Sequence, residues 1–144
     1  MKALFVNFLL LMLFFQMQSC QTQNATNKED HSINRQWMLV EFEDFTKEQL
    51  ANQHANLDLT INKDKPNYTA KMGCNSLFLS ADFKKDEVDF SKIGGTMMFC
   101  KNMELEDAFV KALPKMTTYL IDGHTLILSG ESGEKMKFVA ADWD

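Results

Sequence analysis

The sequence predicts an α+β domain, in which a curled antiparallel sheet of about eight short strands is covered or plugged by one helix. Three observations support this fold class. Apolar residues alternate with a period of two through most of the chain, one segment has the longer helical period, and short polar turns separate the alternating runs. Roughly 110 residues follow the start of the first strand region, which is enough for one small domain.

Five segments before the helix are predicted strands, because apolar and polar side chains alternate in them. They are residues 36–42, 57–61, 67–72, 76–83 and 88–90. The first strand is apolar on both sides, with Trp37 on one face and Met38 and Phe42 on the other. We therefore expect both of its faces to be covered. The acidic segment that follows it, residues 41–50, is expected to be a loop.

Residues 102–113 are the predicted helix, with Asn102 as its N-cap. Acids follow in the first turns, where the helix dipole favours negative charge. They are Glu104, Glu106 and Asp107. Apolar residues at helical spacing form one inward-facing stripe. This stripe consists of Leu105, Ala108, Phe109, Ala112 and Leu113. Pro114 disfavours helical geometry at the preceding residue, so it is expected to end the helix.

Three further strands are expected after the helix, at residues 115–121, 124–129 and 135–140. Asp122-Gly123 is a strong signal for a two-residue hairpin turn between the first two. The order is thus several strands, one helix and a β-meander, without an internal repeat.

The N-terminus predicts export and lipid anchoring. Lys2 precedes an apolar run at residues 3–15, which has the length of a signal peptide core and is too short to span a membrane as a helix. The run 17–20, Met-Gln-Ser-Cys, resembles a bacterial lipobox, in which the cysteine is diacylated. We expect residues 1–19 to be a lipoprotein signal peptide and residues 20–34 to be the lipid anchor, on Cys20, and a flexible tether.

The domain at residues 35–144 would then face the periplasm. Gln21 follows the lipidated cysteine, in place of the aspartate of inner-membrane retention, so the outer membrane is the expected location; a soluble periplasmic protein is the alternative. Loss of the signal peptide leaves 14 basic against 20 acidic side chains, a net charge of −6. This acidic balance argues against nucleic acid as a partner, because there is no basic surface to replace counterions.

The chain shows no pattern of a catalytic, metal or cofactor site. Its histidines, His31, His54 and His124, fall in the tether, in a loop and in a hairpin turn. Its cysteines are not spaced as zinc ligands. Gly94-Gly95 is not followed by the lysine of a phosphate-binding loop. We therefore expect a protein that is not an enzyme and that uses neither a metal nor a cofactor.

Two cysteines, Cys74 and Cys100, remain if Cys20 carries lipid. In an oxidising periplasm an even pair is most simply a disulfide, which would stabilise the fold by about 3–4 kcal/mol in the chain-entropy model. Two free thiols buried beside Met97, Met98 and Phe99 are the first alternative. A redox-active pair is the second, although no C-x-x-C motif lowers the pKa of either thiol.

Several short motifs together resemble the META domain of HslJ-like proteins. They are Trp37-Met38-Leu39, Gly73-Cys74-Asn75, Thr96-Met97-Met98-Phe99-Cys100 and the strand Leu126-Ile127-Leu128. Phe99 departs from this pattern, because a small residue is usual there. The resemblance implies a cracked antiparallel β-barrel with one helix packed across its opening. It also implies bacterial envelope proteins, often lipoproteins, with a heat-shock or stress-related role.

The leading functional expectation is a non-enzymatic envelope lipoprotein that binds a protein partner or an apolar ligand. A set of methionines suited to adaptable packing supports it. These are Met72, Met97, Met98, Met103 and Met116. Two alternatives stay open: a thiol/disulfide redox helper or enzyme that uses Cys74 and Cys100, and a structural subunit of an envelope complex.

Overall fold

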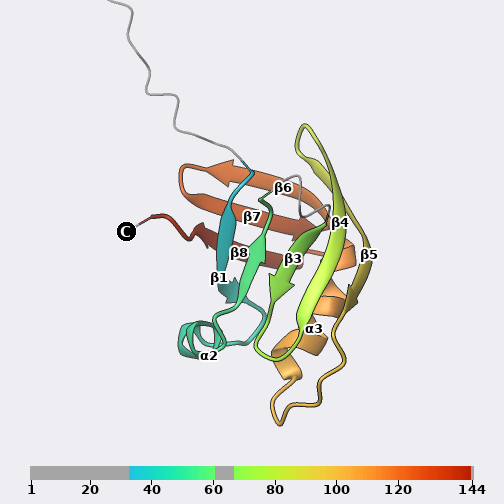
Figure 1. Ribbon diagram of the computed structural model, residues 1–144. Coiled ribbons are helices and arrows are strands. Elements are labelled where there is room, and N and C mark those ends of the chain that lie inside the picture. Colours follow the sequence, from blue (N-terminus) through green and yellow to red (C-terminus); the bar gives the residue numbers. More distant parts are fainter. Residues whose placement is uncertain (1–32, 61–66, 144) are drawn as a thin grey trace, which may run out of the picture.

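Eight strands form a closed antiparallel barrel in residues 33–60 and 67–143, the part of the chain that the computed structural model describes (Figure 1). The strands are β1 Gln36–Phe42, β2 Asn56–Asp58, β3 Tyr68–Lys71, β4 Ser76–Lys84, β5 Glu87–Gly95, β6 Met116–Asp122, β7 Thr125–Gly130 and β8 Lys135–Ala140. Each strand pairs with its neighbours in sequence, and β8 closes the barrel against β1. The predicted α+β barrel is confirmed. The predicted signal peptide, Cys20 and His31 lie outside the described residues.

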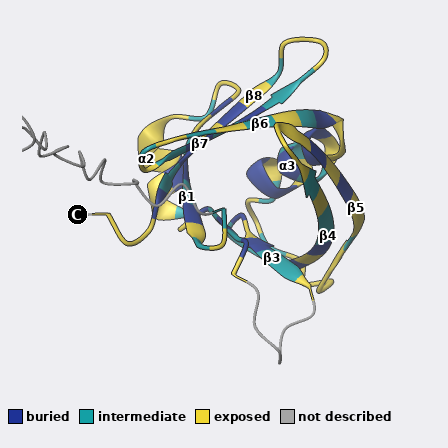
Figure 2. Cartoon of the chain, turned by 90° about the horizontal axis from the view of Figure 1, so that it is seen from above, coloured by how far each residue is buried: buried dark blue, intermediate teal, exposed yellow. Residues whose placement is uncertain are grey.

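The barrel interior is the hydrophobic core, because alternate side chains of every strand point inward. Trp37, Leu57, Leu126 and Phe138 are each 0% exposed. Figure 2, a view from above, shows buried residues on the strands and on the helix that accompanies them. The eight strands thus enclose one continuous apolar cluster.

A β-bulge corrects the predicted faces of β1. Its register with β8 shifts after Leu39, so Val40 occupies an extra position and Phe42 turns to the same face as Leu39. Phe42 is accordingly 1% exposed and pairs with the buried Met136. The outer face of β1 keeps Met38 and Val40, which are half-buried. We expected this outer face to be covered, but the structure covers it only in part.

The predicted helix is α3 Glu104–Ala112, followed by a 3-10 turn, η2 Leu113–Lys115. Its N-cap is Met103, which makes no side-chain capping bond, so the prediction of Asn102 as the N-cap is wrong. Pro114 ends the α-helix as expected, but the chain continues through η2, where a proline near the first position is tolerated.

Helix α3 lies in the chain between β5 and β6, the least extensively paired neighbours of the barrel. Strands β5 and β6 share a single residue pair, Glu87 with Thr118, whereas the other neighbouring strands are paired over longer runs. The apolar side of α3, including Leu105 and Phe109, joins the barrel core. The helix thereby adds its apolar side to the core that the strands enclose.

A second, shorter helix, α2 Lys47–Asn52, occupies the segment that we expected to be a loop. It begins with a capping box: the Thr46 hydroxyl accepts from the Gln49 N–H over 3.2 Å, and Gln49 Oε1 accepts from the Thr46 N–H over 2.8 Å. Leu50 anchors it to the core at 1% exposure. The T-x-x-Q pattern before Leu50 is the sequence signal for this helix.

Candidate functional site

A disulfide joins two segments at one end of the barrel. Cys74 lies in the turn between β3 and β4, and Cys100 lies in residues 96–103 between β5 and α3. Their Cα atoms are 6.1 Å apart and 26 residues apart in sequence. The structure therefore contains the disulfide that was the first expectation for this pair. The residues that hold these two segments together are called the clasp: Gly73, Cys74, Asn75, Thr96, Met98, Cys100 and Glu106.

The Asn75 side chain is the centre of the clasp. Its Nδ2 group donates to Glu106 Oε1 over 2.7 Å and to the Met98 carbonyl oxygen over 3.3 Å. Its Oδ1 accepts from the Thr96 hydroxyl over 2.7 Å and from the Met98 N–H over 2.8 Å. At 3% exposure, Asn75 thus uses both amide protons and both lone pairs inside the protein. One side chain holds both polar backbone groups of Met98.

Glu106 is the member of the clasp that the sequence analysis did not identify. Its two carboxylate oxygens accept from the backbone N–H and from the side-chain Nδ2 of Asn75, each over 2.7 Å, and it is 5% exposed. It was expected only as an acid that the helix dipole favours. Glu106 precedes Phe109 and Leu113 by three and seven residues, so it lies on the same helix face as the apolar stripe. That spacing was the signal for a buried role.

Thr96 and Gly73 complete the clasp. The Thr96 hydroxyl accepts from the Ser76 N–H over 3.2 Å while it donates to Asn75, and the Thr96 N–H donates to the Ser76 carbonyl over 3.1 Å. Gly73 has a φ of 116°, a conformation that residues with a Cβ rarely adopt. The motif segments at residues 73–75 and 96–100 are therefore joined by hydrogen bonds and by the disulfide.

The clasp displays an apolar tip, which we define as Met97, Met98 and Phe99. Met97 is 98% exposed, Phe99 is 97% exposed and Met98 is 55% exposed. The alternative of two thiols buried among these three side chains is wrong, because the three lie at the surface. Two other methionines of the predicted set, Met72 and Met116, are 1% exposed and belong to the core.

The functional groups at this end of the barrel are engaged with one another. Cys74 and Cys100 are joined to each other, and the buried carboxylate of Glu106 accepts hydrogen bonds from Asn75. Within the described ranges, no cluster of three or more metal-ligating side chains occurs. His54 is exposed after α2, and His124 stacks on Trp143 with ring centroids 4.6 Å apart. In the described part of the chain, no helix is long and apolar enough to cross a membrane.

Comparisons with known proteins identify the fold and the family. The NMR structure of a protein from Burkholderia xenovorans is similar at a TM-score of 0.61 and 20% identity, over 76% of this chain and 83% of that one. The crystal structure of a DUF4847 family protein from Bacteroides vulgatus has a TM-score of 0.47 and 17% identity, over 77% and 95% of the two chains. No match is found among curated proteins. A family model for the META domain matches residues 30–143, and the chain therefore belongs to the META domain family.

Proposed function

We propose that this chain is a non-enzymatic cell-envelope lipoprotein that acts by binding a protein partner through its apolar tip. The supporting observation is that Met97 and Phe99 are almost fully exposed on a segment that a disulfide and the Asn75 hydrogen bonds hold in place. A stress-related role and a location at the outer membrane, facing the periplasm and anchored through Cys20, belong to the same proposal.

Preorganisation of the tip would favour binding. Burial of one Met or Phe side chain in a partner would contribute about 1.5–3 kcal/mol. A segment that is already fixed loses less conformational entropy on binding than a flexible one. Methionine also adapts its shape to irregular clefts. The tip thus combines two large apolar side chains, Met97 and Phe99, with a backbone that is restrained before any partner arrives.

The position of the tip favours a partner over the membrane that would carry the anchor. Strands alternate in direction, so the start of β1 and the end of β5 lie at opposite ends of the barrel (Figure 1). Ile33, the first described residue, precedes β1, and the tip follows β5. A lipid on Cys20 would therefore tether the end of the domain that is remote from the tip.

Photo-crosslinking in intact cells tests this proposal. A photoreactive phenylalanine analogue replaces Phe99 in one variant and Leu120 in a control, because Leu120 is a large apolar residue of β6 that is 59% exposed away from the clasp. We expect a discrete protein adduct from position 99 and none of that mass from position 120. Equal adduct patterns from both positions would contradict a specific role for the tip.

Reconstitution with the purified partner completes the test. Phe99→Ser should weaken binding about tenfold to a hundredfold, the equivalent of one buried aromatic side chain, whereas Leu120→Ser should leave it unchanged. Unaltered binding by Phe99→Ser would refute the proposal.

A variant with both Cys74→Ala and Cys100→Ala distinguishes the redox alternative from the proposed binding function. Its folded fraction should still bind the partner, more weakly because the tip is less restrained, whereas a redox helper would lose function while folded.

A further inference from the structure

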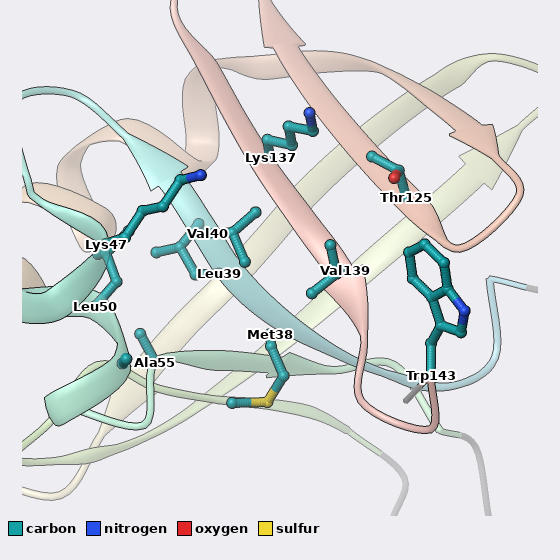
Figure 3. Close-up of a pocket in the computed structure, with 11 residues that line it drawn as sticks. Met38, Leu39, Val40, Lys47, Leu50, Ala55, Thr125, Lys137, Val139 and Trp143 are labelled. Atoms are coloured by element: carbon teal, nitrogen blue, oxygen red, sulfur yellow. The ribbon is translucent and has the colours of Figure 1, made fainter.

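An apolar hollow on the outer wall of the barrel is separate from the clasp. It has a volume of about 530 Å³ and lies across β1 and β8, between α2 and the C-terminal Trp143 (Figure 3). This volume falls within the range of about 300–1,000 Å³ that is usual for small-molecule sites. The hollow is the outer face of β1, which the sequence predicted to be covered and which α2 covers only in part.

The floor and walls of the hollow are apolar. Met38 and Val139 are direct cross-strand partners and, with Val40, form its floor. Leu50 of α2 contributes one wall. Trp143, which is 57% exposed, stands at the other side (Figure 3). An exposed indole beside half-buried aliphatic side chains offers an apolar molecule more contact area than an ordinary polar surface does.

Two lysines give the hollow a charged edge. Lys47 of α2 and Lys137 of β8 are the charged side chains that line it, and Figure 3 shows both ammonium groups on the side of the hollow away from Met38. Within the described residues, neither ammonium group has an ion-pair partner. Glu41 is paired in register with Lys137, but it does not line the hollow.

We propose that this hollow binds the anion of a single-chain fatty acid. The carboxylate would lie between Lys47 and Lys137, and the acyl chain would run over Val40 and Val139 towards Met38 and Trp143. A single carboxylate can interact with both lysines. A single acyl chain is narrow enough to lie on an apolar floor that is only two strands wide. The site is independent of the tip, so failure of either proposal leaves the other intact.

Fluorescence of Trp143 provides the binding signal. The full exported chain is used with Cys20→Ser, so that no attached lipid competes, and dodecanoate is titrated below its micelle concentration. Trp37, the other tryptophan, is 0% exposed and supplies a constant background. We expect a saturable blue shift of the emission. Trp143→Phe should abolish the shift while calorimetry still detects binding.

Chain length and head group identify the ligand class. Extending decanoate to dodecanoate should tighten binding by about fourfold if the two added methylenes are half-buried and by about 15-fold if they are fully buried. Dodecanol should bind more weakly than dodecanoate, and dodecyltrimethylammonium should not displace it. Equal affinity for dodecanol and dodecanoate would overturn the proposal, as would the absence of saturable dodecanoate binding.

Substitutions of single residues that line the hollow, each with a control outside it, test which side chains contact the ligand. Lys47→Gln and Lys137→Gln should each weaken dodecanoate binding by up to about fivefold and leave dodecanol binding unchanged. Lys135→Gln is the control, because Lys135 lies on the same strand outside the hollow. Val139→Gln should weaken both ligands, with Leu120→Gln as its control. If the double lysine variant bound dodecanoate as tightly as the unaltered protein does, the proposed head-group site would be wrong.

Discussion

Replacing Asn75 by alanine tests the clasp most completely, because this side chain bonds to Thr96, Met98 and Glu106. The substitution removes the bonds to Glu106, to Thr96 and to both polar backbone groups of Met98. The disulfide remains in place. The buried Glu106 carboxylate keeps the backbone N–H of residue 75 as its donor, since Asn75→Ala retains that group.

The expected loss follows from these four bonds. A neutral hydrogen bond contributes about 0.5–1.5 kcal/mol and one to a charged group about 1.5–3 kcal/mol, so three neutral bonds and one charged bond give an upper range of about 3–7.5 kcal/mol. The bonds to the Thr96 hydroxyl and to the Met98 backbone are only partly buried, so water replaces part of what is lost. We therefore expect the free energy of unfolding to fall by about 3–4 kcal/mol, most of it from the bond between Asn75 and Glu106.

Urea denaturation of the oxidised protein measures this loss. The midpoint should fall while the slope of unfolding free energy against urea stays unchanged. Asn102→Ala is the matched control: Asn102 is exposed and does not cap α3, so its replacement should cost less than about 0.5 kcal/mol. If Asn75→Ala cost less than about 1 kcal/mol, comparable to the control, the clasp would not be the stabilising network described above.

Three other predictions concern the same fold. Removing the disulfide with Cys74→Ala and Cys100→Ala should lower the unfolding free energy by about 3.5 kcal/mol for this loop length, and an unchanged value on reduction of the unaltered protein would contradict it. Gly73→Ala should cost about 1–3 kcal/mol through backbone strain, and its Cβ would also displace the Gln53 side chain, whereas Gly94→Ala, in open space, should be close to neutral in the same urea assay. Burial raises the pKa of Tyr68 above 10.0, so the folded state holds this proton more tightly and stability should fall as the pH rises from 10.0 through the raised pKa. Tyr68→Phe should remove that alkaline decrease in melting temperature, and an undiminished decrease would assign it to other groups.

Much of the fold could be predicted from local patterns. The period-two alternation located the eight strands because each strand has one face in the core, and the spacing of Leu105, Phe109 and Leu113 located α3 for the same reason. The Asp122-Gly123 signal marked the β6–β7 hairpin. These features depend on residues near each other in sequence, which is why alternation and turn chemistry were sufficient.

The prediction of the side-chain faces of β1 and the prediction of a loop after it were wrong. The alternation of apolar and polar residues does not reveal the physical cause of either error. A bulge at Val40 reversed the face of Phe42, because one extra residue shifts every later side chain to the other side. Helix α2 was missed because its short capping box lies in an acidic segment that has a single buried residue, Leu50.

Most residues of the clasp were identified from the sequence, but the hydrogen bonds that join them were not. The motif cysteines could be paired from their number and the expected compartment. The role of Glu106 could not be assigned, because its partner Asn75 is 31 residues away and only the folded chain brings the two together. The exposure of Met97 and Phe99 could not be predicted either, since large apolar residues are more often found in the core than at the surface.

The most direct test of the central claim is backbone 15N relaxation at Met97, Met98 and Phe99 in the oxidised protein. The proposed function requires a tip that is ordered before it meets a partner, with its apolar side chains in water. We predict order parameters for these amides close to the value of about 0.85 that is typical of rigid backbone, and a clear decrease in Asn75→Ala. Order parameters below about 0.6 in the unaltered protein would show a flexible loop and would contradict the claim that the clasp presents a preformed binding surface.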